Sequence, residues 1–295
     1  MSPIHVVLIP SYNTGDRLFE TIASISPFGL PIIVVIDGST DGTGDRLLQM
    51  AASDPALFAC VQRHNQGKGA AVLHGLRLAL EKGFTHALTM DADGQHSAAH
   101  IAEMIAESHA HPGCMVLGSP LFDESAPRVR VLGHKIANFW TGLVAPAIGD
   151  SLFGFRVYPI APLIEIFDST SGMRRFDFDS EAAIRLSWRG IRPINVATPV
   201  RYFDRDQGGV SHFKYLRDNL LLIAMYVRLF AALVPRFEAW RIASAGISLD
   251  SWRAVFFRHG QAISTSVVRR EMTGSEAGHD DEASVNTGRT LRPLV

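Results

Sequence analysis

Cysteine and net charge are both scarce in this sequence. Of its 295 residues only Cys60 and Cys114 are cysteines, and they lie far apart with no Cys-x-x-Cys pair. This argues against a zinc site or a disulfide and indicates a reducing compartment. The 28 lysines and arginines nearly balance the 29 aspartates and glutamates, for a formal net charge of −1. That balance gives no whole-molecule attraction to nucleic acid, so we expect no nucleic-acid partner.

Targeting and membrane-spanning segments are also missing from the pattern. The first ten residues contain neither a basic stretch nor a long apolar one, so they do not resemble a secretory signal. The apolar run from 220 to 234 is interrupted by Arg228. As a helix it would measure about 22 Å, short of the roughly 30 Å hydrocarbon core of a bilayer. We therefore expect a cytoplasmic protein that does not span a membrane through this run.

Strand and helix patterns alternate over the first 120 residues. Apolar runs typical of buried strands cover 5–9 and 32–36, with weaker ones at 57–61, 87–90 and 115–117. Helical spacing falls between them, over 16–26, 45–52, 68–82 and 98–109. This order predicts an α/β fold with an open, mostly parallel sheet flanked by helices on both sides. Ligands of such sheets bind beyond the carboxyl ends of the strands.

The second half of the chain is less regular. Its predicted elements are helices at 131–144 and 179–189, a strand at 193–196 and one long helix from 213. We divide the chain into an α/β domain over 1–212, an amphipathic helix over 213–240 and a variable tail over 241–295, with disorder expected from about 273. Basic residues flank or interrupt the long helix: Lys214, Arg217, Arg228, Arg236 and Arg241. It suits an anionic membrane surface and, equally, a core helix with exposed arginines.

The segment with the most chemical content follows the predicted strand at 87–90. It reads Asp91-Ala-Asp93-Gly-Gln95-His. Two carboxylates one residue apart, with a carboxamide nearby, are hard oxygen ligands that suit a Mg²⁺ or Mn²⁺ ion that also holds a diphosphate. An Asp-x-Asp pair is common in solvated turns, so the pair alone carries little weight. Its place at a strand end, with other candidate residues at neighbouring strand ends, favours the metal site.

Two other loops follow predicted strands. Asp37 opens Asp-Gly-Ser-Thr-Asp41-Gly, where it can accept hydrogen bonds from a base or a ribose, although the same segment also forms a good turn with Asp41 as a helix cap. Lys68 lies between two glycines at the start of a predicted helix, a position that suits a phosphate or plain solvent. The loop is not a Walker A motif, because Gln62 replaces its first glycine and Gly69 its Ser/Thr.

Together these motifs resemble family 2 glycosyltransferases. The matching segments are Pro10-Ser-Tyr12-Asn13, Asp37-Gly-Ser-Thr-Asp-Gly-Thr, Asn65-Gln-Gly-Lys68-Gly-Ala-Ala and Asp91-Ala-Asp93-Gly-Gln95-His. Their order and spacing are most similar to the branch of dolichol-phosphate mannose synthases and bacterial polyprenyl-phosphate sugar transferases, over about residues 4–215. The resemblance implies a GT-A fold, a nucleotide-sugar donor and an inverting transfer.

The resemblance also implies roles for individual residues. Asp37 would bind the nucleoside, in a pocket lined by Pro10, Tyr12 and Asn13. Asp91 and Asp93 would hold the diphosphate and the metal, with Gln95 as a further ligand. The family usually has two acidic residues where this chain has Ile36-Asp37, which leaves the base of the donor, UDP or GDP, open.

Later segments supply the remaining candidates. Arg128, Arg130 and Lys135 lie in a stretch that resembles the mobile acceptor loop and the helix after it, where cations clamp phosphates; ordinary surface charge is the alternative. The stretch 150–156 resembles a segment beneath the active site, and 176–181 an acidic segment before the last core helix. In the last matching segment, 208–212, His212 would reach the metal or the diphosphate; we place it and Arg156 with the substrate-binding residues.

The expected mechanism is displacement at the anomeric carbon of the sugar. The departing diphosphate would be stabilised by the metal and by Lys68, Arg128 and Arg130. A polyprenyl phosphate, with a second pKa of about 6, is already ionised at neutral pH and needs no strong base. A hydroxyl acceptor would need one, and the candidates are Asp150, Asp179 and Glu181. The basic loop and the amphipathic helix favour a lipid phosphate, with the protein on the cytoplasmic face of a membrane.

Three other functions were weighed against this one. A sugar-phosphate nucleotidyltransferase would carry a glycine-rich loop with an arginine where this chain has Pro10-Ser-Tyr-Asn13. A processive polysaccharide synthase would show Gln-x-x-Arg-Trp and several spanning helices, and neither is present. The third is a degenerate glycosyltransferase fold that serves as a scaffold, and Ile36 is the feature that favours it.

Overall fold

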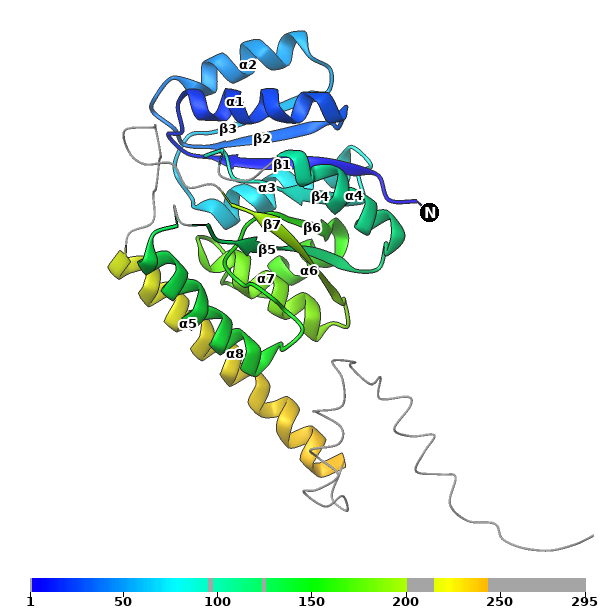
Figure 1. Ribbon diagram of the computed structural model, residues 1–295, viewed down its shortest axis with the longest axis vertical. Helices are drawn as coiled ribbons and strands as arrows, with labels where there is room; N and C mark the ends of the chain where they lie inside the picture. Colours follow the sequence, from blue (N-terminus) through cyan, green and yellow to red (C-terminus); the bar gives the residue numbers. More distant parts are fainter. Residues whose placement is uncertain (1, 95–97, 124–125, 201–214, 244–295) are drawn as a thin grey trace, which may run out of the picture. The chain divides into compact units, whose positions relative to one another are not determined.

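The computed structural model describes residues 2–94, 98–123, 126–200 and 215–243 (Figure 1). Seven strands of this part form one sheet in the order β3-β2-β1-β4-β6-β5-β7. Their bounds are β1 His5–Ser11, β2 Ile32–Asp37, β3 Leu57–Gln62, β4 His86–Thr89, β5 Met115–Leu121, β6 Arg156–Pro159 and β7 Pro193–Pro199. All pairs are parallel except those of β6 with β4 and β5, so the predicted mostly parallel α/β sheet is confirmed.

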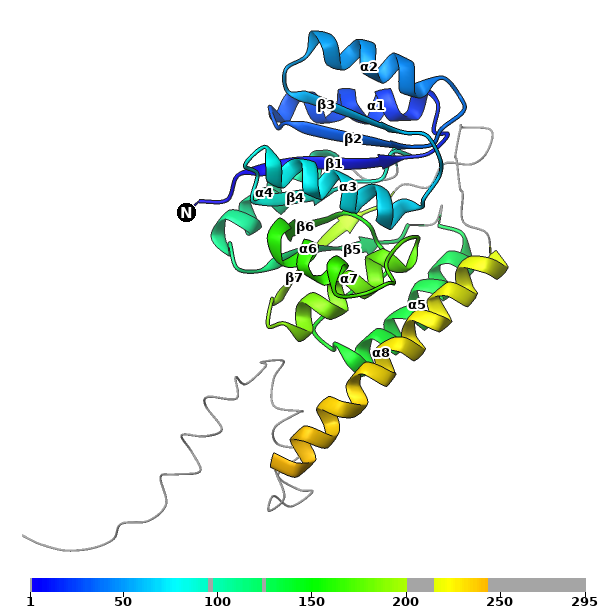
Figure 2. The same ribbon diagram turned by 180° about the vertical axis from the view of Figure 1, so that it is seen from behind.

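Helices cover both faces of the sheet. The α-helices are α1 Asp16–Ile25, α2 Thr43–Ser53, α3 Lys68–Glu81, α4 Ile101–Ala110, α5 Arg128–Val144, α6 Ile160–Asp168, α7 Asp177–Trp188 and α8 Tyr215–Ala243. Two short 3₁₀ helices, η1 Ser26–Phe28 and η2 Ala98–His100, complete the described elements. Figures 1 and 2 view the sheet from opposite sides, with α4 in front in the first and α3 in front in the second.

Strand β1, inside the sheet, is apolar from Val6 to Pro10 because both of its faces are covered. Val6 and Leu8 pack into one core with α3, α6 and α7, whereas Val7 and Ile9 pack into a second core with α1 and α4. Every residue of β1 is buried. A strand covered on both faces loses the alternation of apolar and polar residues that marks a half-exposed strand. The carboxyl ends of β1, β2 and β4 consequently meet at one edge, beneath the loops that carry the candidate residues.

Strand β6 was not predicted. It is only four residues long and begins with Arg156, which is fully buried. A charged residue in a short run hides a buried strand from a search for apolar runs, because burial of the charge depends on partners elsewhere in the chain.

Helices α5 and α8 lie side by side in both views (Figures 1 and 2). The hydroxyl of Tyr226 in α8 donates to the carbonyl of Ala137 in α5, 2.8 Å away, and lies 2.9 Å from the hydroxyl of Thr141. The rings of Trp140 and Phe230 meet edge to face with centroids 6.1 Å apart. The predicted long helix therefore exists, from Tyr215 to Ala243, and pairs with α5.

Arg228, which interrupts the apolar run of α8, forms ion pairs that join α8 to α7; we call this arrangement the Arg228 clamp. Its Nη2 lies 2.7 Å from Glu181 Oε2 and 3.3 Å from Asp177 Oδ2, both on α7. The Glu181 side chain is completely buried and also pairs with Arg185 at 2.7 Å. Since a buried carboxylate needs such partners, Arg228 fixes α8 to the core. Glu181 is thereby occupied and is not a free base.

Of the two interpretations of the long helix, the core packing is confirmed for one of its faces. Leu222, Met225 and Leu229 are buried against the sheet domain. Among the described residues, none of the helices combines the length and the hydrophobicity that crossing a bilayer requires. The predicted disorder after residue 273 lies outside the described residues.

Three histidines lie close together near the amino-terminal ends of β1 and β4, away from the strand ends that carry the candidate site residues. His5 and His86 are register partners at the start of β1 and β4, with ring centroids 5.4 Å apart, and the ring of His109 lies 4.6 Å from that of His5. His5 Nε2 is 2.9 Å from Ser108 Oγ, and His86 Nε2 is 3.0 Å from the carbonyl of Pro112. Burial, followed by the charges of His86 and His109, lowers the pKa of His5 to about 4.

This cluster predicts a loss of stability in mild acid. Because the folded pKa of His5 lies below its value in the unfolded chain, the unfolded chain binds the proton more readily. Stability is complete above about pH 6.5 and falls as the pH drops toward 4, by roughly 2 kcal/mol for His5 once residual solvation is allowed for. Replacing His5 with glutamine keeps a partner for Ser108 and should flatten this fall in urea-unfolding curves between pH 7 and 4.5. Exposed His111→Gln is the control, and an equally steep fall in His5→Gln contradicts the assignment.

Candidate active site

The carboxyl ends of β1, β2 and β4, together with α3, α5, α7 and α8, enclose a cavity of about 1190 Å³. Eight of the residues selected from the sequence line it: Pro10, Tyr12, Asp37, Lys68, Asp91, Asp93, Arg130 and Asp179. Four others, Asn13, Arg128, Asp150 and Arg156, are described but are not among its lining residues. Gln95 and His212 lie outside the described residues, so their predicted roles stay predictions.

Asp37 presents a carboxylate to the cavity, and two backbone N–H groups hold that carboxylate in place. It is 2% exposed, and its two oxygens accept the backbone N–H groups of Gln66 and Gly67, each at 2.7 Å. The carboxylate therefore holds the β3–α3 loop in place. Each oxygen retains a second lone pair that can accept from a ligand.

Asn13 does not line the cavity but holds the loop that follows Asp37. It has a positive φ of 47°, which asparagine tolerates better than most residues. Its side-chain oxygen accepts from the backbone N–H of Thr40 at 2.8 Å, and its own N–H donates to Ser39 Oγ at 2.9 Å. Asn13 thus joins the end of β1 to the loop after β2, whereas Pro10 and Tyr12 line the cavity as predicted.

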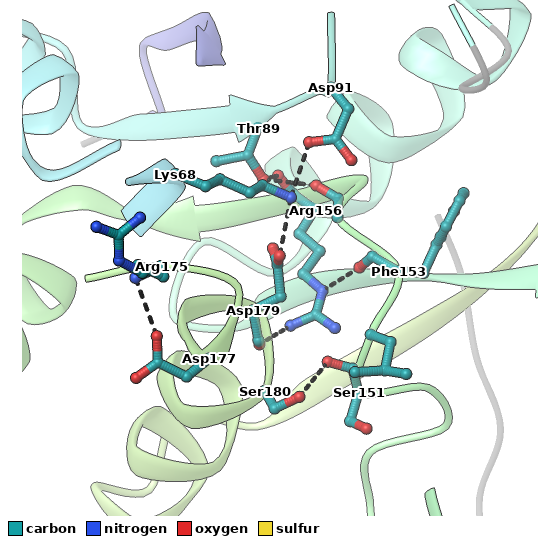
Figure 3. A network of polar contacts seen from close by, with 12 residues as sticks. Lys68, Thr89, Asp91, Ser151, Phe153, Arg156, Arg175, Asp177, Asp179 and Ser180 are labelled. Carbon is teal, nitrogen blue, oxygen red and sulfur yellow. Dashed lines mark hydrogen bonds and ion pairs between the residues drawn. The ribbon is translucent and has the colours of Figure 1, made fainter. Parts of the chain in front are cut away.

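Lys68 is the central cation of the site (Figure 3). Its Nζ lies 2.7 Å from Asp91 Oδ1 after β4 and 2.8 Å from Asp179 Oδ2 on α7. Burial alone would lower the pKa of Lys68, but the two carboxylates outweigh it and raise the pKa, so the ammonium stays charged. Gly69 lets the start of α3 approach α7 and the loop before it closely: a Cβ there would lie 2.8 Å from Phe178 Cβ and would clash with the carbonyl oxygen of Met173.

For Asp179, in contrast to Lys68, the effect of burial on the pKa outweighs that of the neighbouring charges. Burial raises the pKa of its carboxyl, and Lys68 and Arg156 offset that rise only in part. Its Oδ1 is buried and has no hydrogen-bond partner among the residues that the structure describes. A buried orphan oxygen on a cavity wall is a place for a donor from a ligand, such as a sugar hydroxyl.

Arg156 has a different place from the one predicted. It is fully buried, and its guanidinium donates to the carbonyl of Phe153, from Nε at 2.6 Å, and to the carbonyl of Asp179 (Figure 3). It also donates to Tyr158 Oη and to the carbonyl of Asp150. Two of these partners, Phe153 and Asp179, line the cavity, but Arg156 itself does not. The assignment of Arg156 to substrate binding is therefore corrected: it joins the loop before β6 to the first turn of α7.

Asp150 is also occupied. Its Oδ2 lies 2.7 Å from His134 Nδ1 and accepts from the Asn138 amide at 2.8 Å, while Oδ1 accepts from the N–H groups of Leu152 and Phe153 at 3.0 and 2.8 Å. Burial would raise the pKa of Asp150, but these bonds, first that from His134, hold it below the usual range. A saturated, low-pKa carboxylate away from the cavity does not serve as the base proposed from the sequence.

The cations of the cavity differ in part from those expected. The stretch predicted as a mobile loop forms the first turn of α5, which places Arg130 in the cavity wall but not Arg128. Arg175, just before α7, and Arg217, on α8, line the same cavity. Sequence reasoning missed both as site residues, because Arg175 has no motif of its own and Arg217 drew attention only as a flank of the long helix.

The remainder of the wall is apolar. It consists of side chains from two helices: Ile136, Ala137 and Trp140 of α5, and Leu222, Ile223, Tyr226, Val227 and Phe230 of α8. One cavity therefore has a charged end at the strand termini and an apolar end between α5 and α8.

Asp91 and Asp93 fit a divalent cation as a pair. Both present oxygen ligands to the cavity, and no group of three or more His, Cys, Asp and Glu side chains in the described part of the chain is placed to hold a metal by itself. Mg²⁺ commonly takes one or two carboxylates and completes its shell with phosphate oxygens and water. The two side chains therefore suit a cation that arrives with a diphosphate.

Comparisons with known proteins agree on one family. The model of "Glycosyl transferase family 2" matches residues 6–179. Among relatives, an undecaprenyl-phosphate mannosyltransferase of Micrococcus luteus is 27% identical over 69% of this chain and 85% of its own length. A polyprenol monophosphomannose synthase of Mycolicibacterium smegmatis is 29% identical over 69% of this chain and 78% of its own.

A solved structure agrees on the fold. Glucosyl-3-phosphoglycerate synthase from Mycobacterium tuberculosis, crystallised with Mn²⁺, uridine diphosphate and phosphoglyceric acid, covers 79% of this chain and 78% of its own, with a TM-score of 0.55 and 19% identity. At that identity the likeness supports the predicted GT-A fold and nothing finer.

Replacing Gly154 with alanine should weaken binding of a nucleoside diphosphate. A Cβ there would lie 2.8 Å from Lys68 Nζ and 3.0 Å from Asp91 Oδ2, so the ammonium must shift from its position beside Asp91 and its bond there is weakened. Loss of one charge-assisted bond corresponds to about a tenfold weaker affinity. Calorimetric titration with UDP and GDP in Mn²⁺ measures it. Gly113→Ala, where a Cβ meets nothing within 4 Å, is the control, and unchanged affinity in Gly154→Ala would refute this account.

Proposed function

The chain belongs to glycosyl transferase family 2, and from this premise we propose that it moves a sugar, with inversion, from a nucleotide-diphosphate sugar to a polyprenyl phosphate. One observation carries the proposal: a single cavity joins the charged strand ends to an apolar groove between α5 and α8. A lipid phosphate has the same two parts, a dianionic head and a hydrocarbon chain. The relatives named for undecaprenyl phosphate and polyprenol act on lipids of this class.

The donor would occupy the charged end of the cavity. Asp37, Pro10 and Tyr12 line the part beyond β1 and β2, where the nucleoside is expected. The diphosphate would then lie near Lys68, Asp91 and Asp93. The base, UDP or GDP, is left open, because the carboxylate of Asp37 accepts hydrogen bonds from either.

Asp91 and Asp93 would hold Mg²⁺ or Mn²⁺, which when bound offsets the negative charge that grows on the departing diphosphate. The protein's own cations add to this effect. Lys68, held charged between Asp91 and Asp179, would lie close to the leaving group as its charge develops. Arg130, Arg175 and Arg217 line the same cavity and supply the guanidinium groups that bind phosphates best.

The acceptor needs little activation if it is a phosphate. Its second pKa of about 6 leaves an ionised oxygen at neutral pH, and that oxygen attacks the anomeric carbon as the bond to the donor diphosphate breaks. A hydroxyl acceptor would require a base. Of the three carboxylates considered for that role, Asp150 and Glu181 are occupied by other side chains, and Asp179 is paired with Lys68.

The outer faces of α5 and α8 support a position on a membrane. They expose large apolar side chains at helical spacing: Val129, Leu132, Ile136, Phe139, Trp140 and Leu143 on α5, and Leu220, Ile223 and Val227 on α8. Ile136, Trp140, Ile223 and Val227 also line the cavity, so the apolar surface continues into the groove. A bilayer in contact with this face would deliver its lipid straight to the site.

Transfer to a lipid phosphate is the direct test. The full chain, Mn²⁺, polyprenyl phosphate and a panel of labelled UDP- and GDP-sugars should yield a labelled lipid with one of the donors. Asp93→Ala should lower the rate by at least a hundredfold if the carboxylate holds the metal and the diphosphate. Transfer to a lipid hydroxyl but not to the phosphate would refute the acceptor, and full activity of Asp93→Ala would refute the metal assignment.

Membrane binding is tested by the pair Phe139→Glu and Leu143→Glu. Both side chains are exposed on α5 and neither lines the cavity, so the changes should leave the site intact. The double variant loses two apolar side chains that would be buried in the membrane, which should reduce sedimentation with vesicles containing anionic lipid at least tenfold. Leu48→Glu, an exposed leucine of α2, is the matched control. Equal sedimentation of the wild type, the double variant and Leu48→Glu would contradict the assignment of this face to the membrane.

A further inference from the structure

We propose that His134, held by Asp150, binds the phosphate of the acceptor and carries the proton that this phosphate releases on becoming the attacking dianion. The inference rests on the proposed function, because it concerns the acceptor of that reaction. His134 belongs to α5, and sequence reasoning gave it no role.

The geometry fixes which nitrogen is available. His134 Nδ1 lies 2.7 Å from Asp150 Oδ2, and the carboxylate there is ionised and already accepts three other hydrogen bonds. An ionised carboxylate only accepts, so Nδ1 carries the hydrogen. No residue that the structure describes bonds to Nε2, and the ring lines the cavity with 14% of the side chain exposed. Nε2 is therefore the nitrogen that a ligand in the cavity can reach.

The position of the ring suits the head of an amphiphilic acceptor. Arg130 and His134 are four residues apart on α5, so they lie one above the other on the same face of the helix, and both line the cavity. Ala137 and Trp140 continue that face into the apolar groove. A phosphate at Arg130 and His134 would have the donor site on one side and the hydrocarbon groove on the other.

The chemistry of the two groups is matched. A phosphate monoester has a second pKa of about 6 and an unperturbed imidazole one of about 6.5, so a single proton is readily shared between them. With the proton on Nε2, the phosphate is a dianion. One of its oxygens forms the bond to the anomeric carbon, the bond from that carbon to the donor diphosphate breaks, and the diphosphate leaves with the electron pair. The proton stays on the imidazolium, which Asp150 stabilises.

The surrounding groups do not compete for this proton. Asp150 is ionised, and the guanidinium of Arg130 one turn earlier on α5 is always charged. From α8, Tyr226 approaches the same region; burial raises the pKa of its hydroxyl, and the charge of Asp150 adds to that rise, so it stays neutral. The ring of Phe122, edge-on with its centroid 5.0 Å away, carries no charge.

The experiment measures kcat/KM for polyprenyl phosphate and for the donor from pH 5.5 to 9, using the full chain with Mn²⁺. In His134→Gln, kcat/KM for polyprenyl phosphate should fall about 10- to 100-fold at pH 6.5, because one charge-assisted hydrogen bond is lost. At pH 9 it should fall only a few-fold, because an imidazole carries no charge there in the wild type either. The KM of the donor should not change. His111→Gln, an exposed histidine outside the cavity, should behave as wild type.

A second variant guards against a merely structural effect. His134→Lys keeps a cation at pH 9, so it should retain binding of the acceptor and lose the alkaline fall seen in wild type. A loss in His134→Gln that is the same at every pH, or that appears equally in the KM of the donor, would overturn the inference while leaving the proposed function intact. A wild-type enzyme that transfers only to hydroxyl acceptors would overturn both.

Discussion

The ammonium of Lys68, held between Asp91 and Asp179, is the contact on which the site depends. It brings together the end of β4 and the first turn of α7, which are far apart in the sequence. Without it the carboxylate of Asp91, which is 30% exposed, and the buried carboxylate of Asp179 would repel each other. Gly69 and Gly154 leave room for the lysine and its partners, and Arg156 holds the backbone of Asp179 from below. Folding therefore places these charged side chains at the bottom of the cavity, here called the charged floor, before any substrate binds.

Much of this floor is predictable from the sequence, for a physical reason. Asp37 ends a strand, and Lys68, Asp91 and Asp93 come after strands; these strands are parallel and bring their carboxyl ends to one edge of the sheet. Local patterns locate those strands, so the meeting of the residues follows from the fold class. The apolar run of α8 was likewise visible, together with the arginine within it.

The residues that escaped prediction owe their roles to distant partners. Arg156 looks like a substrate ligand until its carbonyl partners are known, and Asp150 looks like a base until His134 and Asn138 are seen to occupy it. His134 lies in the stretch that resembles the acceptor loop and the helix after it, but nothing in that stretch indicates its bond to Asp150. Periodicity also cannot tell that α5 and α8 pair with each other, because either helix could bury its apolar face against the sheet.

The Arg228 clamp has a consequence for the wall of the cavity. A helix held only by apolar contacts can slide or rotate by a residue at little cost, but a guanidinium paired with the buried Glu181 admits one rotation and one register. Asp177, its second partner, also accepts the backbone N–H groups of Met173 and Arg175. The position of α8 against α7, and with it the wall that α8 contributes to the cavity, is thus set during folding and not by a ligand.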